Sequence, residues 1–270
     1  MGKPDLFAYD FMINAFIAGG IVAVMAAIVG FFLVMREQTF AGHALSHIGF
    51  AGATGSVLLG ASPMSGMILI TLCGGATIGA LGEKVSGRDV AIGMVLSIAL
   101  GFGILFLHFY TAYATQINTL LFGNILGVNY SMLWTLASLA IISLTLLSIV
   151  SRPLIFVSLQ PELAEAKGVS SKFMGIIFLT IVAFATSGCI QIVGVLFVFT
   201  LMIGPAAAAQ QISTRLLSGI SLAVLFALSE TWGGLALSYL TNWPSSFWIA
   251  TLSGSVYLIS LTTKYFLNHK

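Results

Sequence analysis

The sequence predicts an all-α protein with many membrane-spanning helices, that is, a polytopic membrane protein. Of its 270 residues, 59% are hydrophobic and only 7% are charged, whereas about 25% of residues are charged in an ordinary soluble domain. Four long stretches contain no Asp, Glu, Lys or Arg: residues 11–35, 38–82, 90–151 and 173–214. This composition excludes a soluble globular domain. The net charge of +2 is spread over the predicted loops, which excludes a basic surface for nucleic acid.

The apolar stretches divide into about nine predicted transmembrane helices, with eight as the alternative count. A helix rises about 1.5 Å per residue, so it needs about 20 residues to cross roughly 30 Å of hydrocarbon. The predicted spans are residues 11–35, 40–60, 64–82, 90–109, 131–150, 173–187, 190–209, 216–240 and 246–266. Together they predict a single membrane domain over residues 1–270.

The positive charges predict the orientation of these spans. With the N-terminus outside, nine of the ten Lys and Arg residues fall on the cytoplasmic side and only Lys3 lies outside, in agreement with the positive-inside rule. Residues 111–128 interrupt the alternation, because a full span there would invert every later one. We therefore expect a short re-entrant segment or broken helix, covered by protein or lining a water-filled cavity. The alternative is a lipid-facing span that changes the count.

Two histidines in F-A-G-H-A-L-S-H, His43 and His47, form the candidate metal site. At positions i and i+4 they share one face of a helix, and imidazole is a common ligand of transition metals. Two imidazoles fill only part of a four-coordinate zinc shell, as suits a site that must release its ion. The alternative is a structural role, in hydrogen bonds to neighbouring helices or at the helix start near Arg36. Glu230, the only carboxylate inside a predicted span, is a further candidate ligand or proton acceptor.

A charged loop over residues 151–172 carries its own helix signals. Pro161 suits a first helical position, Glu162 lies near the positive end of the helix dipole, and Gly168 is a stop signal. We expect a short cytoplasmic helix, either a plain connection or a docking helix for a partner. No G-x-x-x-x-G-K-[ST] pattern occurs in the sequence, so any nucleotide hydrolysis must take place in another polypeptide and the chain itself is not expected to be an enzyme.

Several passages together resemble the zinc/manganese/iron class of ABC transporter permeases. They are F-A-G-H-A-L-S-H near residue 40, L-L-F-G-N-I-L-G-V near 125, Q-P-E-L-A-E-A-K-G-V near 165, V-G-V-L-F-V-F-T-L-M-I-G-P near 200 and G-L-A-L-S-Y-L-T-N-W-P near 240. The resemblance implies a homodimeric permease in the bacterial inner membrane, cytoplasmic ATP-binding subunits and an external metal-binding protein. It also implies that Pro161, Glu162, Leu163, Ala164 and Gly168 belong to the coupling helix that contacts the ATPase.

The histidine motif departs from the family pattern at one position. The family usually has A-G-D-A-L-S-H, in which an Asp and a His are implied as metal-binding groups; here His43 stands at the Asp position and His47 matches the His. Imidazole favours zinc, copper, iron or nickel, whereas carboxylate suits the harder manganese ion. We therefore expect Zn²⁺ as the transported substrate, with Mn²⁺ and Fe²⁺ as alternatives and no permanently bound cofactor.

Two other functional classes are weighed against an ATP-driven importer. A secondary metal transporter driven by an ion gradient would use Glu230 and the histidines as coupled sites, but the docking helix and the absence of a clear internal repeat argue against it. A membrane metalloenzyme is disfavoured because the chain has only four histidines and H-A-L-S-H lacks the Glu of H-E-x-x-H.

Overall fold

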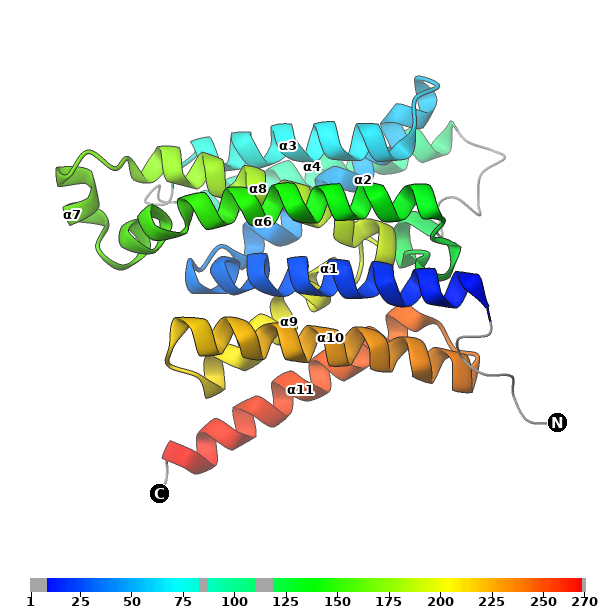
Figure 1. Cartoon of the computed structure of the whole chain (residues 1–270). Helices are drawn as coiled ribbons and strands as arrows, with labels where there is room; N and C mark the ends of the chain where they lie inside the picture. Colours follow the sequence, from blue (N-terminus) through cyan, green and yellow to red (C-terminus); the bar gives the residue numbers. More distant parts are fainter. Residues whose placement is uncertain (1–8, 83–86, 110–118, 269–270) are drawn as a thin grey trace.

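The computed structural model describes residues 9–82, 87–109 and 119–268, and within these ranges the chain is helical without strands. The helices are α1 (Asp10–Met35), α2 (Thr39–Leu58), α3 (Pro63–Ala80), α4 (Arg88–His108), the 3₁₀ helix η1 (Ile125–Gly127), α6 (Tyr130–Leu159), α7 (Pro161–Ala166), α8 (Ser171–Val193), α9 (Val198–Ile212), α10 (Leu216–Thr241) and α11 (Ser245–Asn268). Most of the long helices run side by side, and the short α7 projects from one end (Figure 1).

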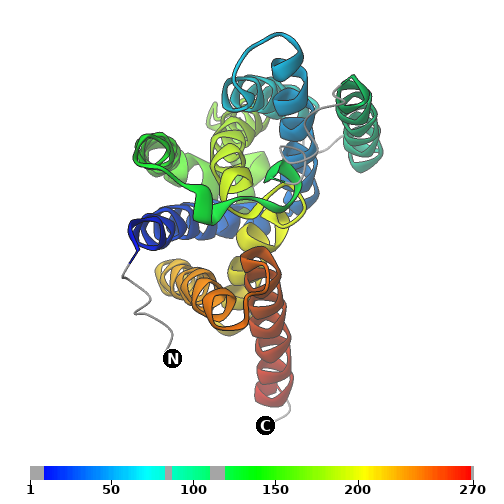
Figure 2. The ribbon, with the colours of Figure 1, turned by 90° about the vertical axis from the view of Figure 1, so that its right-hand side faces the viewer.

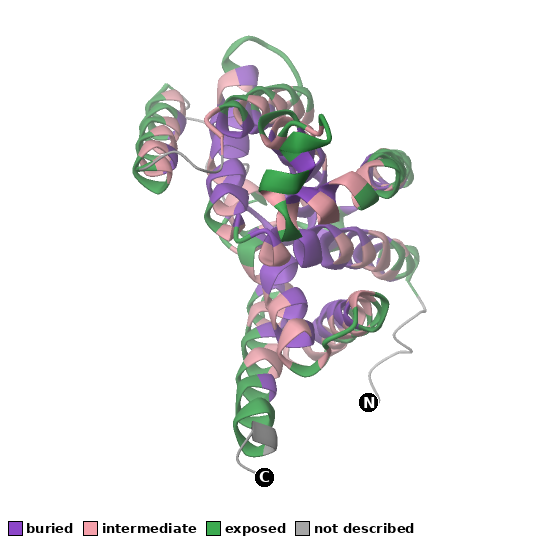
Figure 3. Ribbon diagram, turned by 90° about the vertical axis from the view of Figure 1, so that its left-hand side faces the viewer, coloured by how far each residue is buried: buried purple, intermediate pink, exposed green. Residues whose placement is uncertain are grey.

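The core lies where α1, α2, α8 and α9 meet, while α4 and α11 lie at opposite edges (Figures 2 and 3). Most residues of α1 and α8 are buried, whereas few of α4 are. The outer faces are nevertheless apolar: Ile98 and Phe102 on α4 and Ile259 on α11 are exposed. Apolar surface on this scale suits lipid rather than water, as expected of a membrane protein.

The charges are arranged asymmetrically along the bundle. The α1–α2 and α9–α10 connections, the end of α3, the start of α4 and the C-terminal end of α11 all lie at the same end as α7 (Figure 1). These are the places where the sequence carries Arg36, Arg88, Arg215 and Lys264. The opposite end of the described chain carries the start of α1, η1 and the start of α11. This separation is the one that the positive-inside prediction requires.

Each predicted span overlaps a helix, but the count of nine spans is not confirmed. Within the described ranges, six helices are long and apolar enough to cross a membrane, and α9, with 15 residues, is too short by that criterion. The boundary predicted between residues 187 and 190 is also wrong, because α8 continues to Val193. Ser187 is accommodated inside the helix by donating to the Ala183 carbonyl at 2.9 Å, and the chain breaks at Gly194 instead.

The predicted boundary at residue 150 is wrong as well, because α6 continues past Pro153 to Leu159. Residues 151–159 are therefore helix rather than loop. Leu154 and Val157 are buried, so continuing the helix places apolar side chains against the bundle. Thirty residues at about 1.5 Å each exceed the roughly 30 Å of hydrocarbon, so α6 extends beyond it. The short helix predicted after Pro161 is confirmed as α7.

Part of the predicted re-entrant segment, residues 111–118, lies outside the described residues, and the rest crosses the break between α8 and α9. The backbone N–H groups of Val195 and Leu196 donate to the carbonyls of Leu120 and Leu121, and Asn124 N donates to Gln191 O at 3.2 Å. The backbone of residues 120–124 is therefore hydrogen-bonded to the break between α8 and α9, although Asn124 and Leu126 remain exposed.

A single glycine allows α1 and α9 to touch. A Cβ at Gly30 would overlap the backbone carbonyl of Met202, which cannot move without moving the helix. We expect Gly30→Ala to destabilise the fold by about 1–3 kcal/mol, the usual effect of overpacking. The measurement is thermal unfolding in detergent. Gly101→Ala on α4 is the matched control, since no atom lies within 4 Å of its Cβ. Equal melting temperatures for the two variants would contradict this packing.

Candidate metal site and helical contacts around it

The helix α2 brings His43 and His47 together. Because they are one helical turn apart, their ring centroids lie 4.8 Å from each other, with the ring planes at 86°. Both side chains are half-buried, so the pair lies inside the helix bundle with limited access. The hydroxyl of Ser46, which lies between them in the sequence, donates to the His43 carbonyl at 2.7 Å. This hydrogen bond does not involve either imidazole ring.

The surroundings of the pair leave ring nitrogens unused. Phe199, at the start of α9, packs edge to face on His43 with a centroid distance of 5.4 Å. The Nδ1 atoms of His43 and His47 are both buried, and neither finds a hydrogen-bond partner in the described part of the chain. A buried polar atom without a partner is unfavourable, whereas binding a ligand would satisfy it. The arrangement therefore fits a metal ion or another ligand of imidazole.

The pair does not make a complete metal site within one chain. Among the described residues, no group of three His, Cys, Asp or Glu side chains is close enough to hold one ion. Zn²⁺ prefers four ligands, so two would have to come from water or from groups outside the described residues. The chemistry possible here is reversible binding of an ion.

Glu230 lies on α10, and the structure does not bring it into a ligand cluster with the histidines. Its side chain is 1% exposed, and neither carboxyl oxygen reaches hydrogen-bond geometry within the described ranges. The nearby hydroxyl is Ser253 of α11, which donates to the Thr200 carbonyl of α9 at 3.1 Å. Glu230 thus lies buried at the junction of α9, α10 and α11.

The predicted coupling residues lie on or beside α7, at the projecting end of the molecule (Figure 1). Pro161 begins the helix and Gly168 follows it with a φ of +84°. Ala164 is fully buried and anchors the helix, while Glu162 and Leu163 are exposed. An exposed leucine beside an exposed carboxylate on a projecting helix is accessible to a partner protein.

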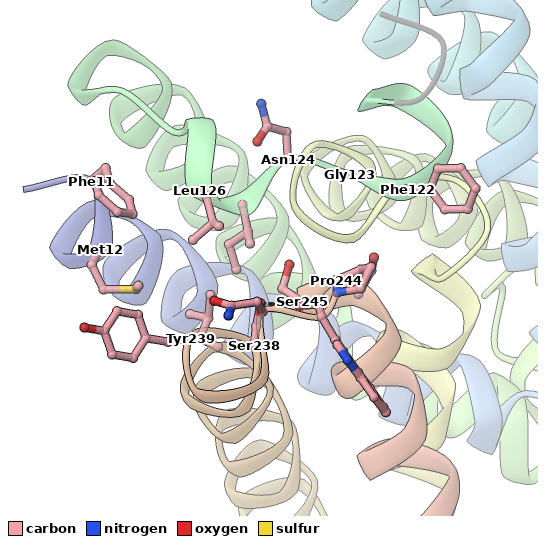
Figure 4. Close-up of a pocket in the computed structure, with 15 residues that line it drawn as sticks. Phe11, Met12, Phe122, Gly123, Asn124, Leu126, Ser238, Tyr239, Pro244 and Ser245 are labelled. Atoms are coloured by element: carbon pink, nitrogen blue, oxygen red, sulfur yellow. Dashed lines mark hydrogen bonds between the residues drawn. The ribbon is translucent and has the colours of Figure 1, made fainter. Parts of the chain in front are cut away.

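A second concave region lies at the opposite end of the bundle (Figure 4). It is a cavity of about 550 Å³ between the start of α1, η1, the end of α10 and the start of α11. Phe11, Tyr239 and Trp243 contribute rings, and Asn124 and Asn242 contribute amides. The described lining residues include no His, Cys, Asp or Glu, so this cavity lacks the usual side-chain ligands of a transition metal.

The sequence does not predict two contacts near this helix. Phe199 carries no signal, because its contact with His43 depends on how α9 packs against α2. Arg36 is predicted on the cytoplasmic side near the start of α2, but its burial, with 7% exposure, and its hydrogen bonds to α6 appear only in the structure. A charged residue seven positions before His43 was the available signal.

Comparison with known proteins adds an independent observation. The sequence matches the model of the ABC 3 transport family over residues 8–264. It is 28% identical to the manganese transport system membrane protein MntC of Listeria monocytogenes, over 94% of this chain and 91% of that protein. It is 24% identical to the high-affinity zinc uptake system membrane protein ZnuB of Haemophilus influenzae, over 94% and 97%. The fold is similar to PsaBC from Streptococcus pneumoniae in complex with Fab, with a TM-score of 0.84, 28% identity and coverage of 94% and 92%.

Proposed function

The chain belongs to the ABC 3 transport family, and from this premise we propose that it is the membrane permease of an ATP-driven zinc importer. The multi-pass helical bundle and the family membership support the permease role. The names of its relatives, a manganese transporter and a zinc transporter, support a divalent transition metal as the transported substrate. The permease itself performs no covalent chemistry, and ATP hydrolysis takes place in a separate cytoplasmic subunit.

The observation that carries the proposal is the pair of buried Nδ1 atoms on His43 and His47, neither of which has a hydrogen-bond partner within the described ranges. The relatives carry names for both manganese and zinc, so the choice between these ions rests on the chemistry of the ligands. Two imidazoles without a neighbouring carboxylate among the described residues favour zinc over the harder manganese ion. With only two ligands from one chain, the ion stays weakly enough held to be released inward.

The proposed transport cycle is alternating access by a homodimer. An external metal-binding protein delivers the ion, which pauses at the histidines on its path across the cell membrane between the long helices of the permease. ATP-driven closure of the cytoplasmic subunits displaces α7, on which Leu163 and Glu162 are exposed. That movement changes the side from which the histidines are accessible. Glu230, buried at a helix junction, is a candidate proton acceptor outside the ion site.

The test is uptake of radioactive zinc into proteoliposomes that contain the permease with its ATP-hydrolysing subunits, with the external metal-binding protein supplied outside the vesicles. We expect uptake to require ATP and to be competed more strongly by unlabelled zinc than by manganese or iron. Uptake that persists without ATP and follows an imposed proton gradient would instead identify a secondary transporter. Stronger competition by manganese would overturn the choice of zinc while leaving the ATP-driven import intact.

A further inference from the structure

Arg36 lies at the junction between α1 and the helix that carries the histidines. It is the C-cap of α1, and Thr39 begins α2 three residues later. Its side chain is only 7% exposed, although a guanidinium is always charged. Burial of such a charge is unfavourable unless its N–H groups and its charge find partners. The partners of Arg36 therefore constrain where the junction can lie.

One set of partners belongs to the end of α6. Arg36 Nη1 donates to the Ser158 hydroxyl at 2.9 Å and to the Leu154 carbonyl at 3.2 Å. The Ser158 hydroxyl donates to the same carbonyl at 2.7 Å, so the three groups form a closed cluster. These contacts lie in the last two turns of α6, directly before α7.

Another partner belongs to α8, the helix that follows α7. The guanidinium carbon of Arg36 lies 5.3 Å from the centroid of the Phe178 ring, within the range of a cation–π interaction. Phe178 is fully buried, so the ring cannot swing out to solvent. Arg36 therefore contacts both α6 and α8, the helices before and after α7 in the chain.

On its other side, Arg36 is joined to the histidines by the short turn between α1 and α2. Gln38 N donates to Leu33 O and Gly42 N donates to Gln38 O, at 3.0 and 3.1 Å, so the turn is held by backbone hydrogen bonds. Gly42 also packs on the Leu33 side chain, where an added Cβ would come 2.5 Å from Leu33 Cδ2. His43 is the next residue. Because this turn is held by hydrogen bonds and close packing, a displacement of Arg36 also displaces the start of α2.

From these contacts we infer that Arg36 is a positioning residue that couples movement of α7 to the histidine pair. The inference rests on the proposed function, since it assumes that α7 is moved by an ATPase. When α7 is displaced, the ends of α6 and α8 move with it, and the guanidinium held between them shifts the start of α2. Arg36 does not touch the ion; it sets the position of the two residues that do.

The experiment measures zinc ions taken up per ATP hydrolysed, in proteoliposomes that contain the permease and its ATPase subunits and are supplied with the external metal-binding protein. The variants are Arg36→Met, Ser158→Ala and Phe178→Leu. Arg36→Met keeps an unbranched stem as far as the position of Nε and removes the guanidinium charge and its hydrogen bonds. Arg215→Met is the matched control, because Arg215 is an exposed arginine at the same end of the bundle. Arg36→Lys keeps the charge without the planar fork, and it tests for partial rescue.

We expect Arg36→Met to lower uptake per ATP by about ten-fold, within the usual range of coupling between sites, while ATP hydrolysis continues. Ser158→Ala and Phe178→Leu should give smaller losses of the same kind, and Arg215→Met should give none. An unchanged ratio in Arg36→Met overturns the inference. If Arg36→Met does not assemble, unchanged ratios in both Ser158→Ala and Phe178→Leu overturn it. Failure of the unmodified transporter to take up zinc with ATP would instead overturn the proposed function.

Discussion

Replacing both His43 and His47 by alanine is expected to abolish zinc uptake while the permease still assembles with its partners. The change removes both imidazoles that face each other at 4.8 Å, so no side-chain ligand remains in the pair. Loss of direct ligands should lower uptake at least about 100-fold, because even changing residues that only orient the ligands of a metal lowers its affinity about 10- to 100-fold. Uptake of radioactive zinc, measured at equal amounts of membrane-inserted protein, is the readout.

Two further variants sharpen this prediction. His108→Ala is the matched control, since His108 is an exposed histidine at the end of α4, beside Phe109. It should leave uptake unchanged. His43→Asp introduces the carboxylate of the usual family pattern A-G-D-A-L-S-H. It should raise the uptake of manganese relative to zinc, because carboxylate suits the harder ion. Normal zinc uptake in the double alanine variant would reject the metal role of the pair.

A second large effect is expected from Gly194→Ala, at the break between α8 and α9. Gly194 has φ of 80° and ψ of 162°, a conformation that residues with a Cβ rarely adopt. A Cβ there would also overlap Gly123 N and the Leu121 carbonyl, so the backbone strip beneath it would have to move. Strain of about 1–3 kcal/mol and the lost Val195–Leu120 hydrogen bond together predict a destabilisation of about 3 kcal/mol or more.

The measurement is thermal unfolding of the detergent-solubilised permease. A destabilisation of about 3 kcal/mol should lower the melting temperature by roughly 6–12 °C for a chain of this size. Gly254→Ala on α11 is the control, since a Cβ there has no atom within 4 Å. It should melt at the original temperature or slightly above it, because alanine favours helix over glycine. A Gly194→Ala protein as stable as this control would show that the break can relax without strain.

The fold class and the places of the helices could be predicted because they depend on local hydrophobicity. A run of about 20 uncharged residues has to form a helix in a membrane, whatever it packs against. The ends of helices could not be predicted in the same way. α6 continues past Pro153 because Leu154 and Val157 find a buried surface, and α8 continues to Val193 because the close packing of Gly123 and Gly194 determines where it stops.

In the candidate site, too, local sequence predicts some features and tertiary packing decides the others. The spacing of His43 and His47 places them on one helical face without knowledge of any other helix. Whether a third group joins them depends on how α2 packs against its neighbours, and the described neighbour is Phe199 rather than Glu230. Glu230 was a reasonable candidate from the sequence, because a carboxylate inside a span is costly, but its burial is among α9, α10 and α11.

By itself, the sequence determined an all-helical membrane protein, a histidine pair on one helix face and a short helix after Pro161. All three follow from properties of neighbouring residues: hydrophobicity, helical spacing and helix-start signals. Only the tertiary structure decided that Arg36 touches both α6 and α8, that Phe199 covers His43 and that Glu230 lies apart from the pair. These contacts join residues far apart in the chain, and their energies come from packing and burial that exist only once the helices are assembled.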